Sequence, residues 1–267
     1  MGDFGLPALF AVLVWWFTTG IILFLDGLPN HTFRWSMTAT TAVLVAAVYC
    51  VRQSSADVSV AGAYAAFSCA IVIWGWLEMS FLMGFITGPR KVSCPDRCNG
   101  WRHFLHASQA IIYNEIATVV AAAGILFGTL NSPNRLALWT FIVLWIMRLS
   151  AKLNLFLGVP NVGDRLLPAH LQYLKGFFRR RPMNYLFPLS ITGATVQVVI
   201  LVHRYASAGD SARSTSLALL ISLLSLAILE HWFMVLPLPT EKLWGWALRS
   251  DRDDHPSDLK AQRRIVL

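Results

Sequence analysis

Long apolar stretches constrain the fold of this chain more than any other feature. A helix needs about 20 apolar residues to cross a bilayer core that is about 30 Å thick. Seven stretches of roughly this length follow one another: residues 6–26, 35–51, 58–87, 103–128, 135–157, 185–205 and 214–237. Apolar residues do not alternate with polar ones within them, which argues against a membrane β-barrel. The sequence therefore predicts an all-α membrane protein, a polytopic bundle of about seven transmembrane helices.

The composition supports this fold class. Charged residues make up 13% of the 267 positions, about half the share of a typical soluble domain. No basic segment precedes the first stretch and no small-residue cleavage site follows it, so we expect it to remain in place as the first helix. Residues 1–238 are then predicted to form the transmembrane domain. Residues 239–267 are predicted to form an amphipathic, charged tail on the cytoplasmic side.

The basic residues predict an orientation. With seven spans, sixteen of the 22 Lys and Arg residues fall on the side that holds the 27–34, 88–102 and 158–184 loops and the C-terminus. Only Arg52, Arg135, Arg204 and Arg213 fall on the opposite side. Cytoplasmic loops of inner-membrane proteins carry such an excess. We therefore expect a multi-pass protein of the bacterial inner (intracytoplasmic) membrane, with the N-terminus in the periplasm and the C-terminus in the cytoplasm.

We interpret the net charge of +8 as reflecting this topology and contact with anionic lipid headgroups. The sequence has no basic domain with interleaved aromatic residues, so nucleic acid is not an expected partner.

Seven polar or charged residues within the apolar stretches stand out as a candidate intramembrane network. They are Glu78, Glu115, Arg148, Lys152, Asn154, Glu230 and His231. An unpaired charge at mid-membrane costs roughly 2.5–3.5 kcal/mol on insertion scales. Arg148 and Lys152 are four residues apart and therefore share one helix face. The economical interpretation is one intramembrane polar network, in which two bases face two or three acids from four helices.

The predicted helix ends indicate how deep these residues lie in the membrane. At 1.5 Å per residue, Glu115 would lie ~18 Å and Lys152 ~8 Å from the cytoplasmic end of its helix. The whole network would then occupy the cytoplasmic half of the bilayer or a layer near its middle. Two roles fit such a network. It can fix the helix packing by mutual neutralisation, or it can leave acids available for a proton, a metal or a pigment.

Three histidines and one glutamate are candidate ligands for a pigment or a metal: His103, His106, His231 and Glu115. Cys94, Cys98, His103 and His106 lie within 13 residues but lack the wide separation between ligand pairs of most zinc sites. We expect Cys94 and Cys98 to be thiols without a disulfide in the reducing cytoplasm. Cys50 and Cys69 are expected to be packing residues. No catalytic nucleophile motif and no phosphate-binding glycine loop is present.

Four segments carry a family resemblance: WGWLEMSFLMGFITGPR (74–90), LWTFIVLWIMRLSAKLNLFLGVPN (138–161), MNYLFPLSIT (183–192) and LEHWFMVLPLPTEKLWGW (229–246). They closely resemble the PuhE family of photosynthetic complex assembly proteins of anoxygenic phototrophic bacteria, and the likeness covers most of the chain. The polar network lies largely within these segments. One departure is Asn114, since the family pattern there reads Tyr-His-Glu and this chain reads Tyr113-Asn114-Glu115.

The resemblance implies a membrane factor that assists assembly of the photosynthetic reaction centre–light-harvesting complex, or that associates with it. Reaction-centre subunits, light-harvesting subunits or other assembly factors would be its partners, and bacteriochlorophyll is the implied candidate cofactor. Two other functions fit the same polar residues: a membrane-embedded enzyme of bacteriochlorophyll metabolism with a Glu/His site, and a proton-linked transporter. A non-catalytic role is the favoured interpretation.

Overall fold

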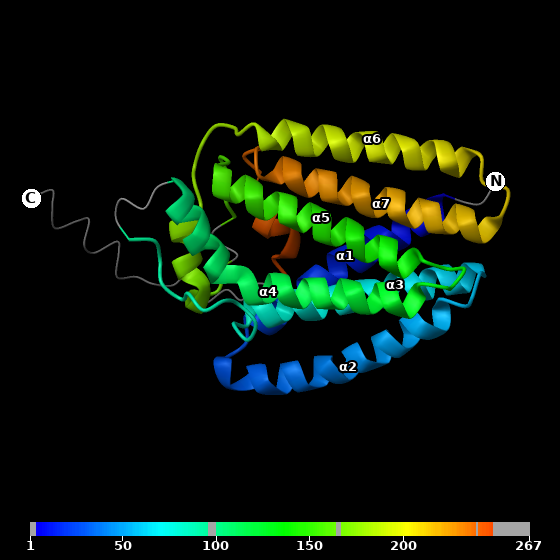
Figure 1. Ribbon diagram of the computed structural model, residues 1–267, viewed down its shortest axis with the longest axis horizontal. Coiled ribbons are helices and arrows are strands. Elements are labelled where there is room, and N and C mark those ends of the chain that lie inside the picture. Colours follow the sequence, from blue (N-terminus) through cyan, green and yellow to red (C-terminus); the bar gives the residue numbers. More distant parts are fainter. Residues whose placement is uncertain (1–3, 96–99, 164–166, 239, 248–267) are drawn as a thin grey trace, which may run out of the picture.

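In the computed structural model the protein is a bundle of seven long helices (Figure 1). The structure describes residues 4–95, 100–163, 167–238 and 240–247, and no strand occurs among them. The helices are α1 (Gly5–Asp26), α2 (Phe33–Ser54), α3 (Val60–Leu82), α4 (Gly100–Thr129), α5 (Leu136–Leu157), α6 (Leu186–Ala206) and α7 (Ser211–Phe233). All seven are long and apolar enough to cross a membrane, which confirms the predicted fold class.

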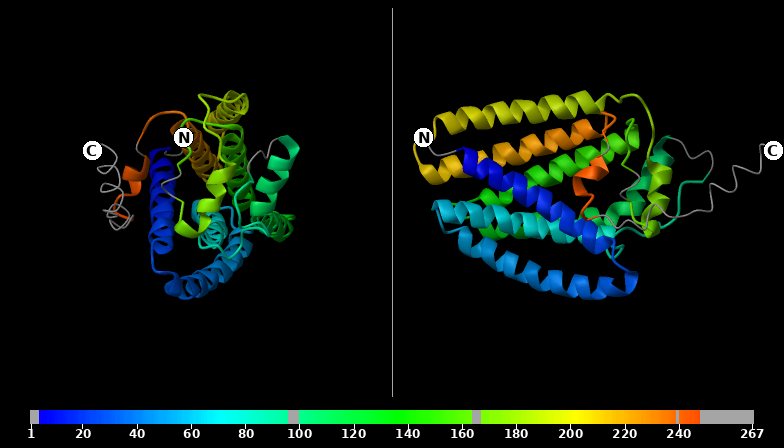
Figure 2. Two further views of the ribbon diagram at one scale, coloured as in Figure 1. Left: turned by 90° about the vertical axis from the view of Figure 1, so that its left-hand side faces the viewer. Right: turned by 180° about the vertical axis from the view of Figure 1, so that it is seen from behind.

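Two helices, α3 and α7, form the centre of the bundle. Their faces carry small side chains such as Ala63, Ala66 and Ala70 on α3 and Ala218 on α7, all of them almost fully buried. In a bilayer, where lipid tails are as apolar as leucine, helices associate by close backbone approach at such small residues. The remaining helices surround this pair (Figure 2). They expose large apolar side chains.

The third helix is shorter than the sequence indicated. The predicted stretch 58–87 becomes a helix that ends at Leu82, and Gly84 follows with φ 80°. This is the left-handed region that favours glycine. The chain therefore leaves the helix at this point and runs as an irregular segment along α4.

That segment interrupts α4. The backbone N–H groups of Tyr113 and Asn114 donate to the carbonyl oxygen of Thr87, at 3.0 and 3.1 Å, instead of continuing the helical pattern. The carbonyl of Gln109, freed by this exchange, accepts from the N–H of Arg90 at 3.4 Å. Insertion of a foreign hydrogen-bonding group into the helical ladder is an established cause of a kink, and α4 changes direction here (Figures 1 and 2).

The C-terminal segment packs on α1 through aromatic side chains. The indole N–H of Trp16 donates to the carbonyl of Leu243 at 3.0 Å, and the indole N–H of Trp244 donates to the carbonyl of Trp16 at 3.1 Å. The ring of Trp246 lies directly on the backbone of α1, because a Cβ at Gly20 would meet it at 2.1 Å. This part of the predicted tail is therefore attached to the bundle, while residues 248–267 lie outside the described residues.

The cysteine expectations were wrong for three positions. Cys50 and Cys69 form a disulfide that links α2 to α3, whereas packing thiols were predicted. Cys94 is also disulfide-bonded, and its partner lies outside the described residues. The first pair could not be predicted from the sequence, because Cys50 and Cys69 face each other only once α2 and α3 are folded side by side.

Candidate functional site

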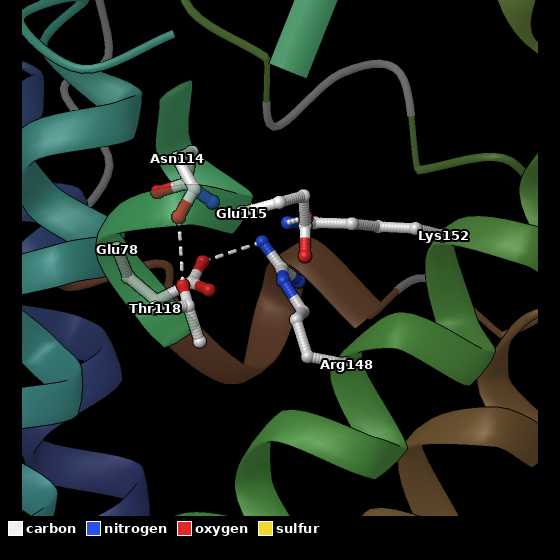
Figure 3. Close-up of polar contacts among 6 residues, drawn as sticks. All are labelled: Glu78, Asn114, Glu115, Thr118, Arg148 and Lys152. Carbon is white, nitrogen blue, oxygen red and sulfur yellow. Dashed lines mark hydrogen bonds and ion pairs between the residues drawn. The ribbon is translucent and has the colours of Figure 1, made fainter. Parts of the chain in front are cut away.

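Two ion pairs join three helices near one end of the bundle. Arg148 on α5 contacts Glu78 on α3, with 2.6 Å between Nη2 and Oε2. Lys152, one turn further along α5, contacts Glu115 on α4, with 2.7 Å between Nζ and Oε1. Figure 3 shows the two bases projecting from α5 toward the two acids. The spacing of four residues places both bases on one face of α5, and that face meets α3 and α4.

The two pairs differ in exposure. The side chain of Arg148 is 41% exposed and that of Glu78 14%, whereas the values for Lys152 and Glu115 are 19% and 21%. Neither pair is sealed inside the protein. The Nε of Arg148 is itself buried and has no hydrogen-bond partner among the described residues.

The third acid, Glu230 on α7, has a different partner. Its Oε1 accepts a hydrogen bond from the indole N–H of Trp15 on α1, at 2.6 Å. Glu230 also lies close enough to Arg148 and Glu78 to interact electrostatically with both. The charged groups therefore come from α3, α4, α5 and α7, and α1 contributes an indole donor that the sequence did not single out.

The bend in α4 changes the expected depth of Glu115. Counted from the start of the predicted helix, Glu115 would lie ~18 Å deep. In the structure Glu115 directly follows the bend at Tyr113 and Asn114, so it stands at the beginning of the straight part of α4. Glu78 and Lys152 lie four and five residues from the ends of their helices at Leu82 and Leu157, about 6–8 Å. The ion pairs thus lie near the end of the bundle where α3 and α5 finish, and the depth of Glu115 in a bilayer stays a prediction.

Asn154 and His231 belong to a separate polar cluster between α5, α6 and α7. Ser150 Oγ lies 2.8 Å from Ser190 Oγ and 2.9 Å from His231 Nε2. The amide nitrogen of Asn154 donates to the Ser150 carbonyl at 3.0 Å. His231 Nδ1 lies 2.9 Å from the Ala227 carbonyl, which can only accept, so this nitrogen carries a proton.

This cluster ties three helices together without a charge pair. In a neutral His231 ring, Nε2 accepts a hydrogen bond from the Ser150 hydroxyl when the Ser190 hydroxyl donates to Ser150. Both ring nitrogens are engaged and the side chain is only 2% exposed. A pigment or metal bound by His231 would have to displace Ser150 first, so the geometry favours a hydrogen-bonding role for this histidine.

The other two candidate histidines lie at the same end of the bundle as the ion pairs, on the first turns of α4. His103 is buried and its ring packs against Phe156 and Phe177, with centroids 5.1 and 5.8 Å apart. The Sγ of Cys94 lies 3.3 Å from His103 Nδ1 and 3.6 Å from His106 Nδ1. Within the described ranges, no group of three or more His, Cys, Asp or Glu side chains is arranged to hold a metal ion.

Comparison with known proteins places the chain in a family. Residues 1–255 match the family model described as "Protein of unknown function (DUF3623)". The chain belongs to this family. A relative from Rhodobacter capsulatus, described as "Uncharacterized 30.4 kDa protein in puhA 5'region", is 39% identical over 263 residues, which span 96% of this chain and 94% of the relative. No solved structure matches the chain.

Three residues of the site were not predicted from the sequence. Trp15, Ser150 and Ser190 were not singled out, because an indole or a hydroxyl in an apolar helix is usually an interfacial or locally bonded group. The spacing of Ser150 and Asn154, four residues apart, was an available signal, since it puts both on one face of α5.

Proposed function

We propose that this family member is an integral membrane factor that assists assembly of the photosynthetic reaction centre with its light-harvesting partners. The observation that carries the proposal is the 39% identity, over nearly the full length of both chains, to a protein whose description puts it in the puhA 5' region of Rhodobacter capsulatus. That agrees with the resemblance of four long segments to the PuhE family.

The outer surface of the bundle suits contact with other membrane helices. Large apolar residues are exposed along α2, α4 and α6, among them Tyr49, Val120, Phe127, Leu189 and Val196. Partner helices would dock laterally in the bilayer by shape and small-residue contacts.

In this proposal the polar network has a structural role. Each base of α5 has an acidic partner, and Glu230 has an indole donor. Paired charges favour one arrangement of neighbouring helices, because any other arrangement would leave a charge unpaired in the membrane. Reaction-centre and light-harvesting subunits, or other assembly factors, are the proposed partners. The N-terminus is proposed to face the periplasm and the C-terminus the cytoplasm.

A deletion of the gene in a phototrophic host tests this function. We expect the near-infrared bands of assembled reaction centre and light-harvesting complexes to fall, while extractable bacteriochlorophyll precursors and pigment enzymes remain. Complementation with the wild-type chain should restore the bands. Accumulation of one specific bacteriochlorophyll precursor would instead make the protein an enzyme of pigment metabolism, with Glu115 and the histidines as the site to examine.

A further inference from the structure

One open groove on the surface of α2 lies apart from the ion-pair network, although Met37 and Thr41 on its floor also contact α3. The groove measures ≈ 390 Å³ and is lined by Arg34, Met37, Thr38, Thr41 and Phe85. Four of these residues lie within the first three turns of α2, and Phe85 belongs to the irregular segment after α3. The groove therefore lies at the same end of the bundle as the ion pairs and most basic residues.

The hydroxyls of the groove are satisfied inside the protein. Thr38 Oγ1 donates to the Arg34 carbonyl at 2.8 Å, and Thr41 Oγ1 donates to the Met37 carbonyl at 2.6 Å. Thr41 also accepts the indole N–H of Trp76 at 3.0 Å. An apolar chain lying over these residues would therefore cover methyl, thioether and phenyl groups without stranding a polar group.

Arg34 supplies the groove with a cation. Its guanidinium is exposed, and within the described part of the chain no carboxylate or hydrogen-bond acceptor contacts it. Trp35, its neighbour, is 78% exposed. An exposed tryptophan at a helix end is typical of the headgroup level of a bilayer, which is the depth at which lipid phosphates lie. The positive end of the α2 dipole points to the same side.

We propose that this groove binds an anionic phospholipid. The guanidinium of Arg34 pairs with the phosphodiester, a geometry that arginine forms readily as a bidentate contact. One acyl chain lies over Met37, Thr38 and Phe85. Residues 34 to 41 span about 10 Å along the helix, enough for the glycerol and the first carbons of the chain. A zwitterionic lipid binds less tightly, because its ammonium group offsets the attraction of its phosphate to Arg34.

Native mass spectrometry of the whole protein, purified in detergent, tests the proposal. The protein is mixed with equal amounts of phosphatidylglycerol and phosphatidylcholine, and bound lipids are counted. We expect an excess of phosphatidylglycerol that Arg34→Gln lowers about fivefold, since one basic residue near the surface contributes about 1 kcal/mol to anionic lipid binding. Arg34→Lys should retain most of the excess, and Thr38→Phe should abolish it by filling the groove.

Arg213→Gln is the matched control, because Arg213 is also an exposed arginine near a helix start but stands at the opposite end of the bundle. Every variant must first elute as wild type in gel filtration. If Arg34→Gln and Arg213→Gln lose bound phosphatidylglycerol equally, the preference for this lipid comes from the net charge of the protein, and the proposal is overturned. Competition by millimolar inorganic phosphate would show an ion site instead of a lipid site.

Discussion

The guanidinium of Arg148 and the carboxylate of Glu78 approach to 2.6 Å across the interface of α3 and α5, although 70 residues separate them in the chain. Lys152 repeats the arrangement one helical turn away with Glu115 on α4. Through these two contacts α5 fixes the position of α3 and α4 near one end of the bundle. In the proposed structural role, these paired charges specify how the three helices meet.

Removal of Arg148 should destabilise the bundle. Arg148→Ala leaves Glu78 without its cation, and breaking a buried pair costs about 3–5 kcal/mol. Because the Arg148 side chain is 41% exposed, we expect a smaller loss, on the order of 1–3 kcal/mol. Thermal unfolding in detergent and the amount of protein in the membrane measure this. The double variant Arg148→Met/Glu78→Gln should recover much of the loss, and wild-type stability of Arg148→Ala would refute the pairing.

A methyl group at Gly88 should disrupt the bend of α4. A Cβ there would lie 2.0 Å from the Gln109 carbonyl oxygen and 2.6 Å from the Ala110 carbonyl carbon, and neither backbone atom can move without shifting the helix. Gly88→Ala should therefore lower the yield of folded protein strongly. Gly124→Ala is the control, since nothing lies within 4 Å of its Cβ and alanine favours the helix. Equal yields of folded protein from the two variants would contradict the close contact between this segment and α4.

The contact of Trp246 with α1 should depend on the absence of a side chain at Gly20. Gly20→Leu would place carbon atoms where the Trp246 ring lies, so we expect the C-terminal segment to detach and become sensitive to limited proteolysis. Gly193→Leu on α6, where nothing lies within 4 Å, should leave the cleavage pattern unchanged. A protected C-terminal segment in Gly20→Leu would show that this contact does not hold it.

Asp57, in the turn between α2 and α3, should make stability depend on acid pH. The backbone N–H of Ser59 donates to its Oδ1 at 2.8 Å and holds the pKa of the carboxyl below its ordinary value of 3.8. Because this pKa is lowered, the contribution of Asp57 to the free energy of unfolding is complete above pH 3.8 and is lost as the pH falls through the folded-state pKa. Unfolding temperatures measured between pH 5 and pH 3 should fall less steeply for Asp57→Asn than for wild type. Parallel curves would exclude this role.

A reporter pair tests the proposed orientation. The basic residues concentrate at the end of the bundle where α1, α3, α5 and α7 finish, and such residues face the cytoplasm. A reporter fused after Leu267 should be active only in its cytoplasmic form. Periplasmic activity at that position would overturn the proposed orientation.

Sequence patterns predicted the helices better than the contacts between them. Each of the seven stretches contains its helix to within a few residues, because the length of apolar sequence needed to cross a bilayer is a strong signal. The bend of α4 could not be predicted, since its cause is the carbonyl of Thr87, a residue distant in the sequence. The link between Cys50 and Cys69 depends on the rotation of two helices about their axes, which apolar length does not encode.

For the candidate site too, the residues could be predicted from the sequence but their contacts could not. The cost of unpaired charge singled out Arg148, Lys152 and the three acids, but it could not say which acid each base meets. Trp15 as the donor to Glu230 was unforeseen, because tryptophans near helix ends are ordinary in membrane proteins.

The most direct test of the assembly role is affinity purification of the protein from its phototrophic host, in mild detergent and during pigment synthesis. The purified material is then characterised by its absorption spectrum, by metal analysis and by identification of the co-purified proteins. An assembly factor should carry reaction-centre or light-harvesting subunits in less than full complement, together with any bacteriochlorophyll they hold. A stoichiometric iron or zinc in the isolated protein, without those subunits, would contradict the assembly role and make the acidic residues an enzyme site.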